Sequence, residues 1–213
     1  MNFAIASRLF GRTATVMTST ATAMAGAATT IIAASIMATT VMAAQLGDDG
    51  LHKQPWFAVT FKDIKEDIET AKADGKRLAI IIEQRGCIYC KKLHETVFSD
   101  AKVVNYIKDH FVVVQYNMFG DEEVIDSDGE TLTEKKAARK WGLAFTPTIM
   151  FLPEDASTKN AKASAVMVMP GAFGRYTTLH MFQWVKEKGY LSDEPFQKYH
   201  ARKLAAAKQA ATQ

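Results

Sequence analysis

The sequence lacks a glycine-rich phosphate-binding loop, an internal repeat and any clustering of its five histidines. It therefore shows no site for tight binding of a nucleotide or another anion. Its charges nearly cancel, because 26 Lys and Arg against 23 Asp and Glu give a net charge of +3. Such a chain has no global electrostatic attraction to nucleic acid or to an anionic membrane, and we expect neither as a partner. The sequence also has few cysteines, and Cys87 and Cys90 are the only two.

Charged residues are absent altogether from residues 13–47. Two arginines precede this stretch, and its second part, TTIIAASIMATTVMAA (29–44), is apolar and ends in small residues. This pattern indicates that residues 1–44 are a secretory signal peptide. The alternative is a retained transmembrane helix, which the many Thr, Ser, Ala and Gly residues disfavour. After cleavage the chain would have a net charge of +1, be long enough for one domain and insert into no membrane.

The hydrophobic patterns of the remaining chain predict one α/β domain at residues 57–200. Residues 45–56 are polar and indicate a flexible lead-in, and residues 201–213 are expected to be a disordered or frayed helical tail. Between them the order is helix, strand, helix, strand, helix, strand, strand, helix. The predicted strands are residues 77–83, 111–117, 145–152 and 165–171. A strand–helix–strand unit followed by an antiparallel hairpin predicts a mixed central sheet with helices on both faces.

Some local features of this domain carry narrower expectations. The apolar stripe of the first helix is expected to begin at Phe61, and Gly75 to end that helix. The acidic stretch 120–131 indicates an exposed loop or a short hairpin. Thr131 and Glu134 fit a capping box at the start of the next helix.

The two cysteines lie in EQRGCIYCKKLHE (83–95), directly after the first predicted strand. A C-x-x-C pair in such a βαβ pattern is the thioredoxin-like redox signature. If a helix begins at Cys87, the helix dipole stabilises its thiolate, which is the nucleophile. Cys90, one turn later, would be more buried and would resolve the mixed disulfide. The basic residues of this stretch either add to the stabilisation or are ordinary solvated charges.

Pro147 stands in FTPTIMFL (145–152), at the start of a predicted buried strand, where a proline needs a structural reason. A cis peptide bond between Thr146 and Pro147 is such a reason. It would turn the Thr146 backbone toward the cysteines and leave an edge that binds an extended substrate segment. The alternative is a trans proline that merely begins the strand, and the C-x-x-C pair favours the cis form.

The two motifs EQRGCIYCKKLHE and FTPTIMFL, with the order of elements, resemble the thioredoxin superfamily. More narrowly, YNMFGDEEV, DGETLTEKKAARKWGLAFTPTIMF and GYLSDEPFQKY resemble the periplasmic thioredoxins of bacterial sulfur-oxidation systems, the SoxW group. The resemblance spans about residues 57–200. It implies a monomeric periplasmic reductase of disulfides in cysteine-containing partners such as sulfur-carrier proteins, supplied with electrons by a membrane thiol transporter. It implies no cofactor beyond a redox-active Cys87–Cys90 disulfide.

The sequence departs from the typical thioredoxin pattern around its cysteines. Gly86 stands where a tryptophan is usual, and Ile88-Tyr89 replaces Gly-Pro between the cysteines. The redox potential therefore does not follow from the resemblance. Tyr89 either shields the disulfide, contacts the partner or has no special role. With Thr146 and Pro147, Gly86 and Tyr89 are the expected substrate-binding residues.

The usual buried aspartate of thioredoxins is also missing. Ile81 stands near its position, and Glu83 is the nearest acid. Glu83 is either a proton acceptor for Cys90 or a cap of the following loop.

Other functions are open to the same motif. Cys87, Cys90 and His94 are spaced to share a helix face and would suit copper(I) or zinc, but three ligands make a weak structural site. More simply, His94 would be a partly exposed helix residue. Haem attachment is excluded because Lys91, and not histidine, follows the second cysteine. Two further alternatives are a disulfide oxidase or isomerase on the same fold and a scaffold with redox-inert cysteines.

Overall fold

The computed structural model of this protein describes residues 45–212. The signal peptide expected at residues 1–44 lies outside the described residues. Among the helices of the described part, none is both long enough and apolar enough to cross a membrane.

The described residues form short N-terminal strands followed by alternating strands and helices. The strands are β1 (Gln45–Leu46), β2 (His52–Lys53), β3 (Arg77–Glu83), β4 (Phe111–Asn117), β5 (Glu123–Ile125), β6 (Thr131–Thr133), β7 (Thr148–Phe151) and β8 (Met167–Pro170). The helices are α1 (Ile64–Ala73), α2 (Ile88–Thr96), α3 (Ala101–His110), α4 (Glu134–Lys140), α5 (Ala161–Ser164), α6 (Arg175–Lys186) and α7 (Phe196–Ala210), with a 3-10 turn, η1, at Gly189–Leu191.

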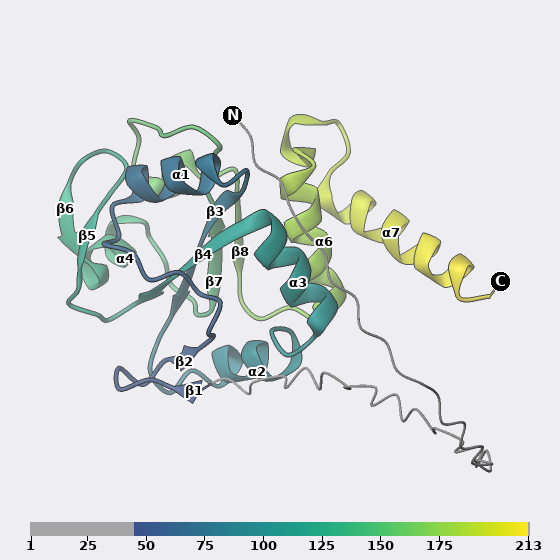
Figure 1. Ribbon diagram of the computed structural model, residues 1–213, viewed down its shortest axis with the longest axis horizontal. Helices are drawn as coiled ribbons and strands as arrows, with labels where there is room; N and C mark the ends of the chain where they lie inside the picture. Colours follow the sequence, from purple (N-terminus) through teal and green to yellow (C-terminus); the bar gives the residue numbers. More distant parts are fainter. Residues whose placement is uncertain (1–44, 213) are drawn as a thin grey trace, which may run out of the picture. The chain divides into compact units, whose positions relative to one another are not determined.

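A four-stranded mixed sheet with the strand order β4-β3-β7-β8 forms the centre (Figure 1). β3 and β4 are parallel, whereas β7 is antiparallel to β3 and β8 is antiparallel to β7. Every residue of β3 is buried, as its continuous run of β-branched residues predicts for an inner strand covered on both faces. Because β3 and β7 are antiparallel neighbours, the C-terminal end of β3 and the N-terminal end of β7 lie side by side at the same end of the sheet.

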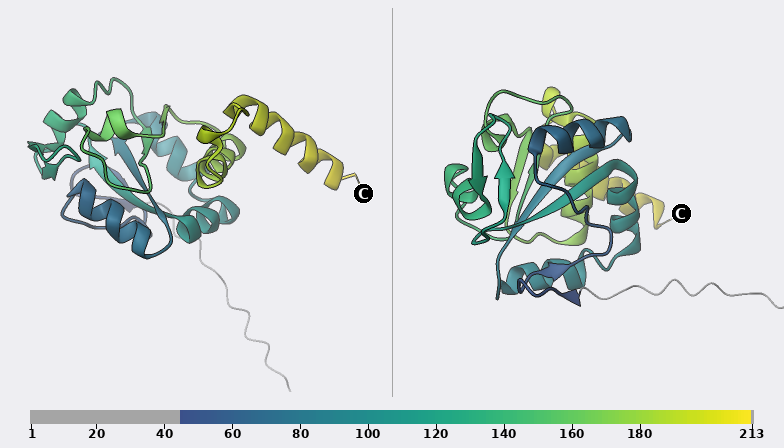
Figure 2. Two further views of the ribbon diagram at one scale, coloured as in Figure 1. Left: turned by 90° about the horizontal axis from the view of Figure 1, so that it is seen from above. Right: turned by 60° about the vertical axis from the view of Figure 1, so that its left-hand side comes forward.

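Helices cover both faces of this sheet. One core lies under α2, α3 and α6, around Leu93, Ile107 and Phe182. The other lies under α1 and α4, around Ile68 and Ala137. Figure 2 shows the sheet and the surrounding helices from two further sides. The predicted α/β class, with a mixed sheet between helices, is confirmed.

The first helix begins later than its apolar pattern suggested. The Asp63 carboxylate caps α1 by accepting hydrogen bonds from its first N–H groups. Phe61 therefore precedes the helix and is 92% exposed, so the expectation that it begins the buried stripe is wrong. Gly75 follows the helix with φ of +69°, as expected of a helix end.

The acidic stretch forms the β5–β6 hairpin, one of the two expected forms. The predicted capping box is wrong. Thr131 lies in β6, paired with Ile125, and Thr133 caps α4 by accepting a hydrogen bond from the Lys136 N–H. The register of the hairpin, which a sequence pattern does not show, places the cap two residues later.

The segment 45–56, expected to be a flexible lead-in, is instead folded against the domain. β1 and β2 pair as an antiparallel hairpin, and Leu51 is 2% exposed. Gln54 is also buried, and the Trp56 ring packs edge-on against Phe98. One leucine and one tryptophan thus anchor a segment whose composition is otherwise that of a loop.

The sequence predicts a disordered or frayed helical tail at residues 201–213, and the structure shows a helix over most of this segment. α7 is a continuous helix through Ala210 and leads to the C-terminus (Figure 1). Its first half is held by side chains, since the Tyr199 hydroxyl donates to Glu187 and the Arg202 guanidinium binds Glu194 through two nitrogens. These contacts cross to preceding elements, so the local sequence gives no sign of them.

Candidate active site

The two cysteines form a disulfide at the N-terminus of α2. Cys87 is the N-cap residue, Cys90 lies in the first turn, and their Cα atoms are 5.2 Å apart. The Cys90 backbone N–H donates to Cys87 Sγ at 3.0 Å. After reduction, this N–H and the helix dipole face the Cys87 sulfur and stabilise its thiolate.

The two sulfurs are not equally accessible. Cys87 is 9% exposed and Cys90 is 1% exposed. An incoming sulfur atom can therefore reach Cys87 first, while Cys90 stays behind it. This is the order of accessibility that an attacking Cys87 and a resolving Cys90 require.

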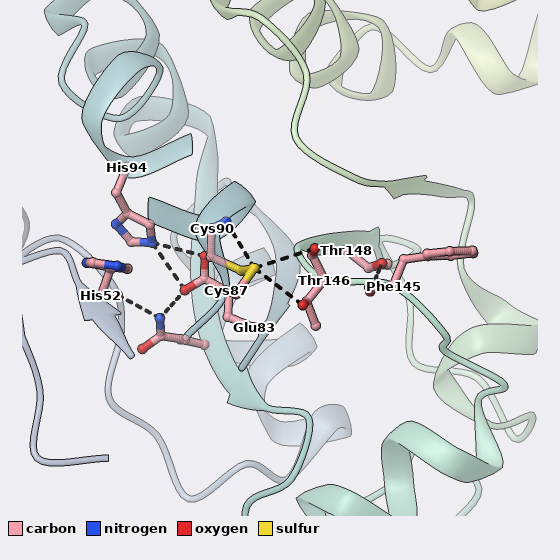
Figure 3. The surroundings of a disulfide bond; sticks show 9 residues. His52, Glu83, Cys87, Cys90, His94, Phe145, Thr146 and Thr148 are labelled. Carbon is pink, nitrogen blue, oxygen red and sulfur yellow. Dashed lines mark hydrogen bonds and ion pairs between the residues drawn. A yellow bond between two sulfur atoms is a disulfide. The ribbon is translucent and has the colours of Figure 1, made fainter. Parts of the chain in front are cut away.

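The loop before β7 lies against the outer cysteine. The Thr146–Pro147 peptide bond is cis, as predicted. Thr146 Oγ1 donates to Cys87 Sγ at 3.4 Å, and the Thr146 carbonyl oxygen lies 3.5 Å from the same sulfur (Figure 3). In the disulfide Cys87 has no hydrogen to donate, so the carbonyl contact is not a hydrogen bond. A reduced Cys87 thiol has that hydrogen.

The same loop is fixed by two further hydrogen bonds. Thr148 Oγ1 donates to the Phe145 carbonyl at 2.7 Å, and the Gly171 N–H donates to the Pro147 carbonyl at 2.7 Å. Pro147 itself is buried. The position of Thr146 beside Cys87 is thus set by the loop and by the residue that follows β8, and not by Thr146 alone.

The surface around Cys87 carries exposed apolar side chains. Ile88 and Tyr89 are 72% and 58% exposed, and Phe145, on the opposite loop, is 68% exposed. Gly86, just before Cys87, is exposed with φ of +72°, a left-handed conformation that favours glycine. These exposed side chains make the surface on both sides of Cys87 apolar.

An open hollow of about 540 Å³ separates Cys87 from the β1–β2 hairpin. Arg85 and Lys91 line it, together with His52. The Arg85 guanidinium faces carbonyl oxygens of the hairpin at 3.4 and 3.5 Å. Lys91 forms an exposed ion pair with Glu95 at 3.7 Å. Both cations therefore interact with other groups as well as adding positive charge near Cys87.

Glu83, the last residue of β3, is fully buried. Both carboxylate oxygens lie near His94 Nε2, at 3.0 and 3.1 Å (Figure 3). Gln115 Nε2 donates to Oε2 at 2.5 Å. The carboxylate bonds these side chains of α2 and β4 and not the N–H groups of the following loop. The alternative that Glu83 caps this loop is therefore wrong.

His94 is 1% exposed, so the expectation of a partly exposed residue is also wrong. Its ring packs edge-on against Phe57 and Phe98, with centroids 5.7 and 5.3 Å away. Its Nδ1 lies 3.1 Å from Gln54 Nε2. With both nitrogens bonded to protein groups, the ring is not free to bind a metal with the cysteines. No group of three His, Cys, Asp or Glu side chains within residues 45–212 is arranged to hold a metal ion.

The structure thus brings together the expected residues and adds others that the sequence did not indicate. Cys87 and Cys90 form the disulfide and Thr146 lies against its outer sulfur, as predicted, while Glu83 lies among the surroundings of the disulfide (Figure 3). The sequence does not indicate Gln54 or Gln115 as site residues, and it indicates His94 only as an alternative metal ligand. All three contribute to the surroundings of Glu83. Their one signal in the sequence is the position of His94, four residues after Cys90 on the same helix face.

Residues 64–163 match the family described as "Thioredoxin-like domain". The chain is similar to the solved structure of a thioredoxin from Thermus thermophilus, with 23% identity over 60% of this chain and 86% of that chain, and a TM-score of 0.46. It is also similar to a putative disulphide-isomerase from Bacteroides thetaiotaomicron, with 24% identity over 65% and 96% of the two chains, and a TM-score of 0.45. A thioredoxin-fold protein from Helicobacter pylori gives 19% identity over 65% and 86%, and a TM-score of 0.44. No curated protein matches the chain.

Proposed function

Because this chain has a thioredoxin-like fold, with the matched domain at residues 64–163, we propose that it is a thiol–disulfide oxidoreductase that reduces disulfides of partner proteins. One observation carries the proposal. A disulfide caps α2 with Cys87 9% exposed and Cys90 1% exposed, and Thr146 lies against the more accessible sulfur. This arrangement separates a sulfur that attacks from a sulfur that resolves.

The reaction runs in two exchange steps. The Cys87 thiolate attacks one sulfur of the partner disulfide, a Cys87–partner S–S bond forms, and the other partner sulfur leaves as a thiolate. Cys90 then loses its proton to Glu83 and attacks Cys87 Sγ. The mixed disulfide breaks, the second partner thiolate leaves, and two electrons have passed to the partner. An external thiol reductant restores the dithiol.

Substrate binding is assigned to the two sides of Cys87. Gly86 and Tyr89 form one side, and Thr146 with Pro147 forms the other. A partner segment in extended conformation fits beside Thr146, where main-chain groups can pair with it. The exposed side chain of Phe145 adds apolar contact on the same side.

The proposed setting is the periplasm, supported by the leader pattern of residues 1–44 and by the resemblance to periplasmic thioredoxins of sulfur oxidation. The partners would be periplasmic proteins with reactive cysteines, including sulfur carriers, and the electron donor a membrane thiol transporter. The protein would act as a monomer, without nucleic acid and without a cofactor besides the Cys87–Cys90 disulfide.

Insulin-type disulfide reduction tests the reaction with two matched variants. Cys87→Ser should abolish reduction, because the attacking sulfur is lost. Cys90→Ser should accumulate a mixed disulfide on Cys87, which mass spectrometry detects, and its capture from periplasmic extract identifies the partner. If neither variant changes activity or capture, the dithiol mechanism is wrong.

The alternative of a disulfide oxidase or isomerase on the same fold differs in the direction of electron flow. Equilibration of the Cys87–Cys90 pair with glutathione measures its reduction potential. A potential in the reducing range supports the proposed direction. A strongly oxidising potential would contradict it while leaving the exchange chemistry in place.

A further inference from the structure

The hydrogen bonds around His94 fix where its proton lies. Trp56 Nε1 can only donate, and it donates to Gln54 Oε1 at 3.2 Å. The amide of Gln54 is therefore oriented with Nε2 toward His94 Nδ1, at 3.1 Å. Since an amide nitrogen donates, Nδ1 accepts and carries no hydrogen. His94 is then the neutral tautomer with its hydrogen on Nε2, which faces Glu83.

The Gln115 amide, on the other side of Glu83, is oriented in the same way. Lys53 Nζ can only donate, and it donates to Gln115 Oε1 at 2.8 Å. This orients Gln115 Nε2 toward Glu83 Oε2, at 2.5 Å, and toward the His52 carbonyl, at 2.8 Å. Both amides beside the site are thus oriented by donors from the segment 45–56, which lies before the matched domain.

We infer that His94 is a positioning residue that holds Glu83 as acceptor of the Cys90 proton, and that Gln54 and Trp56 set its tautomer. This inference rests on the proposed function and adds the N-terminal segment to the site. Glu83 Oε2 accepts from both His94 Nε2 and Gln115 Nε2, which occupies its two lone pairs. Glu83 Oε1 accepts from His94 Nε2 only. One lone pair of Oε1 is therefore left to accept a proton.

The position of this network links it to the resolving step. Cys90 and His94 are one turn apart on α2, so their Cβ atoms are about 5–6 Å apart. Cys90 must lose its proton before its sulfur attacks Cys87 Sγ, and burial leaves little bulk water to take it. The proton passes to Glu83, the Cys90–Cys87 bond forms, and the partner sulfur leaves with the electron pair of the broken mixed disulfide.

Nitrogen-15 NMR of the histidine side chains tests the tautomer directly in the wild-type protein, oxidised and reduced. The expected signal for His94 is a neutral ring protonated at Nε2. In Gln54→Glu, an isosteric change, both carboxylate oxygens accept, so the hydrogen should move to Nδ1 or the ring should become doubly protonated. A wild-type ring protonated at Nδ1 would overturn the inference.

A chromogenic aryl disulfide separates the two exchange steps, since the reduced protein releases one thiolate on attack by Cys87 and one on resolution by Cys90. His94→Leu should slow the second release by about tenfold, a modest share of a general-base effect, and leave the first unchanged. His94→Gln should restore most of the rate, because its amide N–H reaches the place of Nε2. If His94→Leu matches wild type, or His94→Gln is no better than His94→Leu, the inference is wrong.

Two tryptophans provide a matched control for the rest of the network. Trp56→Phe removes the donor that orients Gln54 and should slow the second release. Trp184, on α6, has a similar donor, which bonds to the Glu194 carbonyl at 3.2 Å. Trp184→Phe removes this donor and should not slow the second release. If both variants, or neither, slow it, Gln54 does not act through its orientation. If the wild-type protein resolves no mixed disulfide, the proposed function fails. If the wild-type protein resolves it and His94→Leu resolves it at the same rate, only this inference fails.

Discussion

At the scale of single residues, surroundings decide what a side chain does more than its type does. Cys87 and Cys90 are three positions apart, yet Cys87 caps a helix and keeps 9% exposure, whereas Cys90 is 1% exposed. Two buried carboxylates differ in the same way. Glu83 receives N–H donors from two elements, whereas Asp67 receives one hydroxyl, from Thr60 at 3.1 Å.

The pH dependence of stability should report on Asp67. Burial, with the nearby Asp63 and Glu66 carboxylates, raises the pKa of Asp67 to about 6. Its pKa in the unfolded chain is about 3.9, so the folded state binds more protons between these values. The free energy of unfolding should therefore fall as the pH rises from 4 to 6, and ionised Asp67 costs up to about 3 kcal/mol at pH 7.

Asp67→Asn should remove this slope and raise stability at pH 7, as measured by urea unfolding across the pH range. Asp74→Asn is the matched control, because Asp74 is exposed at the end of the same helix. It should leave the slope in place. If the pH dependence of stability persists in Asp67→Asn, it arises from other titrating groups.

At the scale of elements, the β1–β2 hairpin shows how few contacts are needed to fix a polar segment. Leu51 is 2% exposed, whereas Leu46, in the same hairpin, is 65% exposed. Leu51→Ala should lower the free energy of unfolding by about 2–3 kcal/mol, since it leaves a cavity. Leu46→Ala should change it by less than about 0.5 kcal/mol. Equal effects in urea unfolding would mean that the hairpin is not anchored through Leu51.

The contact between α6 and α7 should weaken in acid. His180 Nδ1 lies 2.7 Å from His200 Nδ1, and burial, with the charges of His200, Lys203 and Lys102, lowers the pKa of His180 to about 4. The unfolded chain, with a histidine pKa near 6.5, takes up this proton first. The contribution of neutral His180 to the free energy of unfolding is therefore complete above pH 6.5 and is lost as the pH falls toward 4.

Amide hydrogen exchange can measure this loss in α7. Protection factors of α7 amides should fall by at least about tenfold between pH 6.5 and pH 4. His180→Gln should abolish the pH dependence of this protection, because glutamine does not titrate. His110→Gln, on α3, should leave it unchanged. Protection that stays constant in the wild-type protein would show that His180 does not couple to α7.

At the scale of the whole molecule, Arg77 joins the sheet to the C-terminal part. It is buried at the start of β3 and donates to the Val185 and Leu152 carbonyls, at 2.7 and 3.1 Å, and to the Tyr190 hydroxyl at 3.1 Å. Arg77→Met leaves these acceptors without a donor. We expect it to cost about 3 kcal/mol or more in urea unfolding.

The control for this substitution is Lys72→Met, which breaks an exposed ion pair with Asp155 at 2.5 Å. A surface pair of this kind contributes up to about 1 kcal/mol. A loss from Arg77→Met no larger than from Lys72→Met would mean that Arg77 does not hold the C-terminal part in place.

Particular residues show which parts of the fold and the site could be predicted from the sequence. The inner strand RLAIIIE was predicted because two-sided burial demands an unbroken apolar run, and Cys87, Cys90 and the cis Thr146–Pro147 bond followed from short motifs. Phe61 and Thr131 were misplaced because a cap or a hairpin register shifts an element by two or three residues. The fold of residues 45–56 was missed because one buried leucine leaves no periodicity.

The sequence by itself determined the mixed sheet, the position of the cysteine pair after an inner strand and the helix that begins at it. Each of these depends on contacts between near neighbours in the chain or on the period of apolar residues, both of which are visible in a single sequence. Tertiary structure alone decided the surroundings of Glu83. Trp56, Gln54 and His94 form a chain of hydrogen bonds across 40 positions between Gln54 and His94. Such bonds depend on how elements pack, and packing brings together residues whose separation in the sequence carries no signal.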